Sequence, residues 1–312
     1  MYAITGITGR VGGIAARALL DAGEPVRAVV RGADKGAPWA AQGCEVALAT
    51  ASDAGALKHA FSGAEGVFLM TAPVFDPEPG FPLMRAIAAA TVAAIKEARP
   101  GRVVFLSTVG AQAREPNLLS GANMMERALR SVSVPVAFLR PAWFMENAEW
   151  DVEAAKGGVV PSFLQPLDHA IAMVATSDIG AVAAQLLRDR WSGVRVVELE
   201  GPRRYSANDI GAAFANVLGR PVRMEAVERE RWESLFRAQG MQNPTPRMRM
   251  LDGFNEGWID FEDKRAVRKT ATPLETVLAE LVARSGALQW REQNTLTHLS
   301  KCESKSGGPS RG

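Results

Sequence analysis

The stretch "ITGITGRVGG", residues 4–13, decides the fold class of this chain. It places Gly6, Gly9 and Gly12 at three-residue spacing directly behind the first apolar run. Glycine costs backbone entropy on folding and packs no side chain, so the cluster predicts a backbone that turns tightly and lies close to another group. Glycines cluster in many turns, and the spacing acquires meaning only from the elements around it.

The elements predicted around these glycines are a strand, a helix and a second strand. Residues 2–5 are a short apolar run, residues 12–22 have helical spacing, and residues 25–31 alternate as a strand. A dinucleotide-binding loop requires this βαβ context. The first glycine then permits the turn, the second lets the main chain approach a pyrophosphate, and the third lets the helix pack on the sheet. Free N–H groups at the helix start would bind the phosphates. A strand-turn-helix whose glycines serve packing alone is the alternative.

The same alternation of strand and helix continues to residue 141. Because the strands are apolar on both faces, it predicts a parallel sheet covered by helices on each side. We therefore assign residues 1–146 to a Rossmann-type, doubly wound α/β domain. Further helices are predicted at 35–43, 53–63 with Asp53 as N-cap, 81–98 and 121–132, and further strands at 44–49, 65–73, 102–108 and 135–141.

Residues 147–286 are predicted to form a smaller C-terminal α+β lobe that binds a substrate or a partner. A helix at 176–189, with Asp178 as its cap, precedes a strand at 194–201 that we expect to return to the main sheet. Residues 287–312 lose periodicity and are polar and glycine-rich, which predicts a disordered tail. Within the lobe, helices are expected at 206–219, 229–240 and 272–286, a short strand at 220–228, and a loop-rich segment at 241–262.

The end of the second strand predicts which nicotinamide cofactor is bound. An acidic residue that binds the ribose 2′-hydroxyl is expected there, about 20 residues after the glycines. This sequence has Arg31 instead, with Lys35 one helical turn further, and a cationic pair suits a 2′-phosphate. NADP(H) is therefore favoured over NAD(H). Asp34 lies beyond the strand end between two cations, so we discount it, and the alternative is that both cations are solvated surface charge.

Ligands of such a sheet lie at the carboxyl ends of its strands. Met70 and Phe68 precede one such end and are expected to belong to the core. The predicted cofactor contacts are Gly6, Thr8, Gly9, Arg10, Val11, Gly12, Arg31 and Lys35 from the first βαβ unit, and Thr71, Ala72, Pro73, Ser107, Thr108, Pro141 and Phe144 from later strand ends.

Taken together, these motifs resemble the NmrA-like branch of the atypical short-chain dehydrogenase/reductase superfamily. The matching pieces are "GITGRVG", "VRAVVRGADK", "VFLST", "MMERALRSVSVP" leading into "VAFLRPAWFMEN", and "ATSDIGAVAAQLL". The resemblance covers residues 1–201 and extends more loosely to about residue 284. It implies a Rossmann-type domain that binds NADP(H), a small C-terminal lobe and a cleft between them. Relatives include quinone oxidoreductases, isoflavone-type reductases and redox-sensing regulators. The family pattern implies that Gly6, Thr8, Gly9, Gly12, Arg31 and Lys35 hold the phosphates.

One departure from the superfamily concerns the proton donor. Reductive chemistry there often relies on Tyr-x-x-x-Lys, in which the tyrosine protonates a carbonyl as it is reduced. The chain has only Tyr2 and Tyr205, neither with lysine at that spacing, and Ala122 stands where many NmrA-like proteins carry a lysine. A quinone needs less help, because hydride transfer yields a stabilised hydroquinone anion that solvent can protonate. The remaining candidates for catalysis are Ser107, Asn123 and His169.

Composition narrows the class of protein further. Net charge is +2, from 36 basic and 34 acidic residues, which argues against a nucleic-acid or polybasic membrane surface. Cys44 and Cys302 show no metal-ligand spacing and are expected to be reduced thiols in a cytoplasmic protein, and we expect no metal site. Glu126 and Arg140 can pair. Aromatic residues that could line a planar-ligand pocket or belong to the core are Trp143, Phe144, Trp150, Trp232, Phe236, Phe254 and Trp258.

These observations lead to two hypotheses. The first is a cytoplasmic NADP(H)-binding oxidoreductase that reduces quinones or similar planar acceptors by hydride transfer without a Tyr-Lys pair. The second is a non-catalytic, NADPH-sensing regulatory protein that binds a protein partner and responds through conformation. Turnover of NADPH by an acceptor separates the two. The oligomeric state is not indicated by the sequence.

Overall fold

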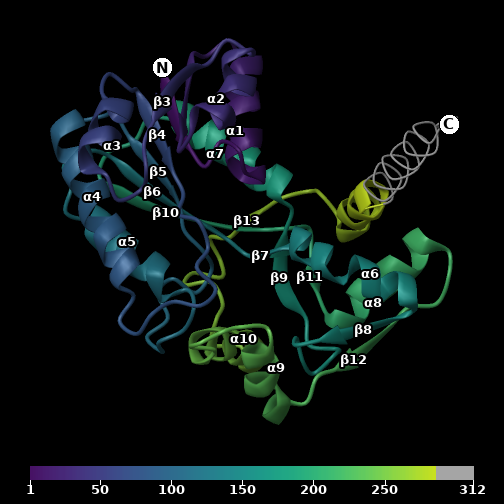
Figure 1. Cartoon of the computed structure of the whole chain (residues 1–312). Helices are drawn as coiled ribbons and strands as arrows, with labels where there is room; N and C mark the ends of the chain where they lie inside the picture. The colour runs from purple at the N-terminus through teal and green to yellow at the C-terminus, as the bar shows by residue number, and fades with distance from the viewer. Residues whose placement is uncertain (286–312) are drawn as a thin grey trace, which may run out of the picture.

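Eight parallel strands form one sheet within residues 1–285, the part of the chain that this computed structural model describes (Figure 1). Their order is β13-β10-β6-β5-β4-β1-β2-β3, and every neighbouring pair is parallel. The order reverses between β1 and β4, where a doubly wound sheet binds its ligand. The predicted Rossmann-type α/β fold is confirmed. The strands are β1 Tyr2–Thr5, β2 Val26–Val30, β3 Glu45–Leu48, β4 Gly66–Leu69, β5 Val103–Leu106, β6 Val136–Pro141, β10 Val194–Glu200 and β13 Arg268–Lys269.

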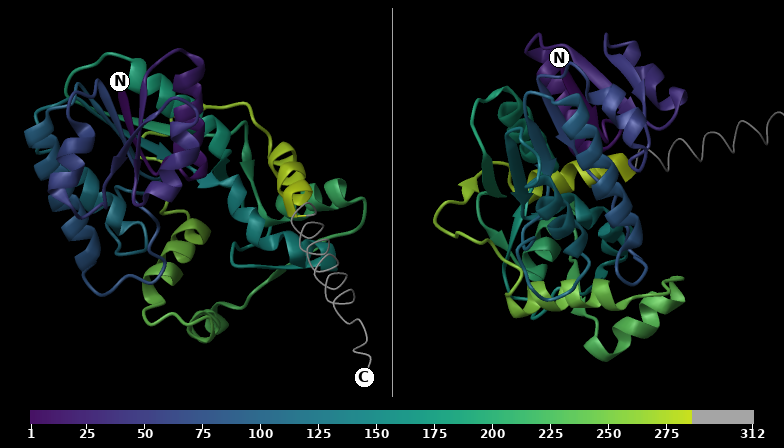
Figure 2. Two further views of the ribbon diagram at one scale, coloured as in Figure 1. Left: turned by 45° about the horizontal axis from the view of Figure 1, so that its top comes forward. Right: turned by 90° about the vertical axis from the view of Figure 1, so that its left-hand side faces the viewer.

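Helices cover both faces of the sheet (Figure 2). Two separate hydrophobic clusters lie beneath them, because successive strand residues point to opposite sides. Ile4 and Phe68 belong to one cluster, while Ala3 and Val67 belong to the other. One face carries α1 Arg10–Asp21, α2 Ala33–Ala40 and α7 Thr176–Arg188; the other carries α3 Ala54–Phe61, α4 Pro82–Ala98 and α5 Ser120–Leu129.

Local sequence signals set several helix ends. The Asp53 carboxylate accepts a hydrogen bond from Ala56 N at 2.9 Å, so this residue caps α3 as predicted. The predicted cap of α7 is wrong, because Asp178 instead accepts hydrogen bonds from Thr272 N and Oγ1. The first turn of α7 is held by Glu146, whose carboxylate accepts from Thr176 N at 2.9 Å. The cap of α7 therefore comes from Glu146, in a segment earlier in the chain, and not from Asp178 of the helix itself.

Two segments within the range predicted for the lobe belong to the main sheet. Strand β10 pairs with β6, from Val194 opposite Val136 to Leu199 opposite Pro141. Helix α7 packs against α1 so closely that a Cβ on Gly180 would lie 2.5 Å from Cγ2 of Ile14. The lobe is thus interrupted by elements that complete the sheet.

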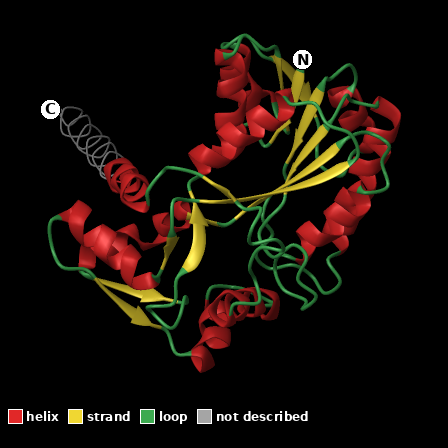
Figure 3. Ribbon diagram, turned by 180° about the vertical axis from the view of Figure 1, so that it is seen from behind, coloured by secondary structure: helices red, strands yellow, loops and turns green. Residues whose placement is uncertain are grey.

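The rest of the second half forms a smaller body beside the main sheet (Figure 3). Its strands make a three-stranded sheet, β11-β9-β7, and a parallel pair, β12-β8. The described part of the chain ends within a helix over 274–285, and the predicted tail lies outside it, as does Cys302. The elements are β7 Trp143–Phe144, η1 Met145–Asp151, α6 Val152–Gly157, β8 Val159–Ser162, β9 Ile171–Val174, β11 Arg204–Tyr205, α8 Ala207–Leu218, β12 Arg223–Ala226, η2 Arg229–Arg231, α9 Trp232–Ala238 and α10 Thr245–Glu256.

The loop-rich prediction for residues 241–262 is wrong, because α10 occupies the middle of that segment. Proline stands at the start of α10, where its missing N–H costs nothing, and Gly257 ends the helix with φ +80°. The interior Gly253 makes room for a neighbour, since a Cβ there would lie 2.6 Å from Cδ1 of Ile259. Proline and glycine mark the ends and packing of α10 instead of breaking it.

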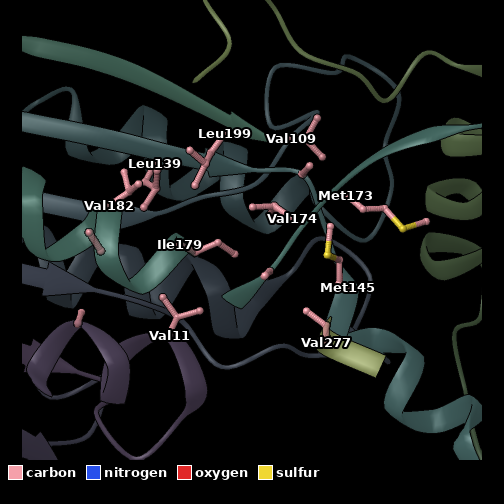
Figure 4. Close-up of a cluster of buried hydrophobic side chains, with 14 of the residues drawn as sticks. Val11, Val109, Leu139, Met145, Met173, Val174, Ile179, Val182, Leu199 and Val277 are labelled. Carbon is pink, nitrogen blue, oxygen red and sulfur yellow. The ribbon is translucent and has the colours of Figure 1, made fainter. Parts of the chain in front are cut away.

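One hydrophobic cluster joins the two bodies (Figure 4). Leu139 and Leu199 of the main sheet and Ile179 of α7 belong to it, together with Met145 and Met173 from the smaller body. All five side chains are almost fully buried. The two bodies therefore share a core, and the surfaces beside that core can hold a ligand in a fixed geometry. Among the described residues, no helix combines the length and apolar character needed to span a bilayer. Cys44 is a buried free thiol.

Candidate functional site

The glycine loop follows β1 and needs glycine at two positions. Gly6 has φ +61°, a left-handed conformation that other residues adopt at a cost. A Cβ on Gly12 would lie 2.4 Å from the carbonyl oxygen of Gly6, so the start of α1 packs directly on the turn. The loop itself closes through a hydrogen bond from Gly9 N to Gly6 O at 2.9 Å. This is the close approach of helix and turn that the glycine spacing predicts.

The start of α1 leaves main-chain donors free at the loop. The first bond along the helix runs from Gly13 N to Gly9 O at 2.9 Å. The N–H groups of Arg10, Val11 and Gly12 precede it and have no partner within the helix. Such donors at the positive end of a helix dipole form an anion site, which fits a pyrophosphate. The Val11 side chain points into the core, so only its N–H is available there.

A shallow pocket extends from this loop to the start of α2, and we call it the loop pocket. Lys35 lines it together with Asp34, to which its ammonium lies 3.6 Å away. Arg17, which the sequence analysis did not select, also lines it, with its guanidinium 5.8 Å from the Trp39 ring centroid. Arg31, which follows β2, is exposed and does not line the loop pocket. The loop pocket is lined by Ile7, Thr8, Gly9, Arg10, Gly13, Arg17, Asp34, Lys35, Pro38 and Trp39.

A larger cavity of about 520 Å³ lies at the carboxyl ends of β4, β5 and β6, and we call it the central cavity. Its walls come from both bodies and are mostly apolar. Trp143, Phe144, Trp150 and Phe254 supply aromatic surface. The predicted contacts Thr71, Ala72, Pro73, Ser107, Thr108 and Phe144 all line it.

Other predicted residues lie elsewhere. Pro141 is buried at the end of β6 and does not line the central cavity. Trp232 and Phe236, which could have lined a pocket or belonged to the core, are fully buried in a separate hydrophobic cluster under α9. They therefore belong to the core. Met70, which was expected in the core, packs against the main core cluster and also lines the central cavity, with its side chain close to Gly6.

The three catalytic candidates are not brought together. Ser107 lines the central cavity, but its hydroxyl lies 2.5 Å from a Glu126 carboxylate oxygen. Asn123 donates from Nδ2 to the Ala111 carbonyl at 2.7 Å and does not line the cavity. His169 is exposed on a turn and lies outside the cavity, so we do not carry it forward as a catalytic group.

Glu126 is held by a buried arginine, as the sequence analysis expected. Arg140 donates from Nε and Nη2 to its two carboxylate oxygens at 2.8 and 2.7 Å. Both side chains are buried, and Nη1 of Arg140 also reaches Glu262 at 2.7 Å. Burial disfavours the charged guanidinium, but these hydrogen bonds outweigh it and raise the pKa of Arg140 above its usual value. Arg140 holds the Glu126 carboxylate, and this carboxylate in turn fixes the Ser107 hydroxyl at the cavity wall.

Four charged residues line the central cavity, Asp76, Glu78, Asp151 and Arg247, and none of them was found from the sequence. The carboxyl of Asp151, at the end of η1, makes no hydrogen bond or ion pair within the described chain, and burial raises its pKa to about 7. Arg247, on α10, is half-buried, and burial lowers the pKa of its guanidinium. Neither lies in a motif, and only the tertiary fold brings them to the cavity. No group of metal-ligating side chains occurs among the described residues.

Comparison with known proteins places the chain in a family. The model of the NmrA-like family matches residues 2–272. The chain belongs to the NmrA-like family. A (4-alkanoyl-5-oxo-2,5-dihydrofuran-3-yl)methyl phosphate reductase of Streptomyces griseus is 32% identical over 230 residues, covering 72% of this chain and 76% of the relative. An NAD(P)H azoreductase of Xenophilus azovorans is 28% identical over 262 residues, covering 82% and 85%.

Among solved structures, the fold resembles an NADPH-dependent quinone oxidoreductase from Escherichia coli, crystallised with NADPH. The TM-score is 0.74 at 24% identity, over 91% of this chain and 99% of the other. The resemblance to the NmrA-like branch that the glycine loop and the later motifs indicated is thereby confirmed, and with it the Rossmann-type architecture.

Proposed function

We propose that this protein is an NADP(H)-dependent oxidoreductase that reduces planar, electron-poor acceptors such as quinones. The observation that carries the proposal is the central cavity, whose aromatic walls stand at the carboxyl ends of β4 to β6, beside a loop built for a diphosphate. A flat apolar ring fits such a cavity. The relatives named above reduce an azo compound, a dihydrofuranone phosphate and a quinone according to their names, which supports a reductase.

The loop residues fit the cofactor that this reaction needs. The N–H groups of Arg10, Val11 and Gly12 would hold the pyrophosphate, and Arg31 and Lys35 would hold the 2′-phosphate. Arg17 points into the same loop pocket and is a third cation for that phosphate. When bound, NADPH would supply a hydride, which carries one proton and two electrons together to the acceptor.

Asp151 provides the proton that a Tyr-Lys pair would otherwise supply. Its carboxyl lines the central cavity, and with a pKa of about 7 a large share is protonated at neutral pH. A quinone that accepts a hydride becomes a hydroquinone anion, and transfer of the Asp151 proton to that oxygen completes the hydroquinone. The carboxylate left behind regains a proton from solvent. The hydride and the carboxylic proton together balance the reduction.

The experiment is an acceptor panel with the purified protein and NADPH. The panel holds a naphthoquinone, a benzoquinone and an azo dye, and loss of the nicotinamide absorbance band reports turnover. We expect oxidation of NADPH with the quinones and a lower rate for Asp151→Asn. Binding of NADPH without oxidation by any acceptor would instead support a regulatory protein.

A further inference from the structure

Arg247 is the one basic side chain among the described residues that line the central cavity. It lies near the start of α10, on the wall formed by the smaller body. The other charged side chains that line the cavity are Asp76 and Glu78, from the segment between β4 and α4, and Asp151. Most of the remaining wall is apolar, so the guanidinium stands in surroundings of low polarity.

The guanidinium has no carboxylate partner within the described part of the chain. The sole polar contact of Arg247 there is from Nη1 to Sδ of Met241 at 3.8 Å, a weak acceptor. Its position is fixed by stacking, with the charged carbon 4.4 Å from the Phe236 ring centroid. Burial alone acts on the pKa of Arg247, and it lowers that pKa, which is what desolvation without a compensating anion produces.

The neighbouring arginine on the same helix differs from Arg247, because it has carboxylate partners. Arg249, two residues further along α10, lies 3.6 Å from Asp252 and 3.7 Å from Glu115. The carboxylate of Asp76 in the cavity wall is already occupied by the N–H groups of Gln242 and Asn243, both at 2.7 Å. The donors of Arg247 are therefore free for a ligand in the cavity.

We propose that Arg247 is an anion subsite of the central cavity, which selects planar aromatic ligands that carry a carboxylate, sulfonate or phosphate. A desolvated cation without a counter-ion is costly, and an anionic substituent removes that cost while forming charge-assisted hydrogen bonds. The planar guanidinium matches the two oxygens of such a group. The reduction of these ligands rests on the proposed function, whereas their binding does not.

The test compares two fluorescent probes of nearly the same shape, 8-anilinonaphthalene-1-sulfonate and the uncharged N-phenyl-1-naphthylamine. Binding is measured with NADP⁺ present so that the loop pocket is filled. In Arg247→Met, we expect affinity for the sulfonate to fall about 10- to 100-fold, and affinity for the uncharged probe to change by less than about threefold. Arg249→Met, on the same helix but outside the cavity, should leave both affinities unchanged.

An equal loss for both probes, or no loss for either, would overturn the subsite. Arg247→Gln is the second variant if Arg247→Met does not fold, and it should show the same selective loss. Steady-state kinetics with a naphthoquinone and its sulfonate should show a rise in KM for the sulfonate alone. If no acceptor is reduced but the selective loss of sulfonate binding is seen, the proposed function fails and the subsite stands.

Discussion

Gly12 is the glycine of the loop that packs most closely on main-chain atoms, because a Cβ there would meet the carbonyl group of Gly6, which cannot move without the rest of the turn. We expect Gly12→Ala to destabilise the fold by about 1 to 3 kcal/mol, the usual cost of overpacking, and to weaken NADPH binding at least about tenfold. Thermal unfolding and titration calorimetry measure the two effects. Gly157→Ala is the control, because a Cβ at Gly157 meets nothing within 4 Å. Equal behaviour of the two variants would contradict the packing account.

Arg31 is the residue that we propose favours NADP(H) over NAD(H). It is exposed at the end of β2 and has no ion pair within the described chain. Removing a charge-assisted hydrogen bond to the 2′-phosphate in Arg31→Ala should weaken NADPH binding about tenfold, with NADH binding unchanged. Calorimetry with both nucleotides tests this, with Arg220→Ala as the control on the smaller body. A parallel loss for NADPH and NADH would remove Arg31 from the phosphate site.

Asp151 makes stability depend on pH in a predictable direction. Burial raises the pKa of its carboxyl to about 7 in the folded state, against about 3.9 in an unfolded chain. The folded protein therefore holds more protons between these values, and the free energy of unfolding falls as pH rises from about 4 through about 7. The shift corresponds to about 2 to 4 kcal/mol. Urea unfolding at about pH 5 and about pH 8 should show a smaller difference in Asp151→Asn than in the parent protein.

The same substitution tests the proton-transfer role. In the parent protein, turnover with a quinone should decline above about pH 7 as Asp151 ionises. Asp151→Asn should lower kcat about 10- to 100-fold, at the low end for general acids because solvent can also protonate a hydroquinone anion, and should lose this pH dependence. An unchanged pH profile in Asp151→Asn would show that another group supplies the proton.

At the scale of elements, the buried pair Glu126–Arg140 joins α5 to β6. Glu126→Gln leaves the buried Arg140 short of its main partner and should destabilise the fold by about 3 to 5 kcal/mol. The exposed pair Glu233–Arg237 on α9 offers a matched comparison, and Glu233→Gln should cost less than about 1 kcal/mol. Denaturant unfolding of both variants tests the contrast. If the two variants lose similar amounts of unfolding free energy, burial does not account for the contribution of the Glu126–Arg140 pair to stability.

Elements with strong local signals were predictable from the sequence. Strands β4 and β5 in the middle of the main sheet are continuous apolar runs, and Asp53 and Gly6 act through contacts within a few residues of themselves. The short strands β7, β9 and β11 could not be found, because two to four residues carry no periodicity and the pairing comes from distant segments. Helix α10 was missed since its prolines and glycine were interpreted as breaks.

The residues of the candidate site likewise fall into those that the sequence predicts and those that it does not. The glycine loop and the strand-end residues Thr71, Ser107 and Thr108, which line the two pockets, could be selected because the fold class dictates where strand ends lie. Asp151 and Arg247 could not, since their importance comes from burial in a cavity whose walls are far apart in the sequence. A charged residue in a loop or helix is ordinarily solvated, and nothing local marks these two as exceptions.

At the scale of the whole molecule, the cavity depends on two bodies that share one core. The loop pocket belongs to the Rossmann-type body alone, whereas the walls of the central cavity come from both. Cofactor binding and acceptor binding should therefore be separable by mutation: changes near Arg247 alter the acceptor, and changes near Gly12 alter the cofactor.

The central claim is that this member of the NmrA-like family passes a hydride from NADPH to a planar acceptor in the central cavity. Anaerobic mixing of the purified protein with NADPH and a naphthoquinone tests it most directly. The account predicts many turnovers per protein molecule, with equal amounts of NADPH and quinone consumed and a slower rate for Asp151→Asn. Tight binding of NADPH with no oxidation by quinones or azo dyes would contradict it.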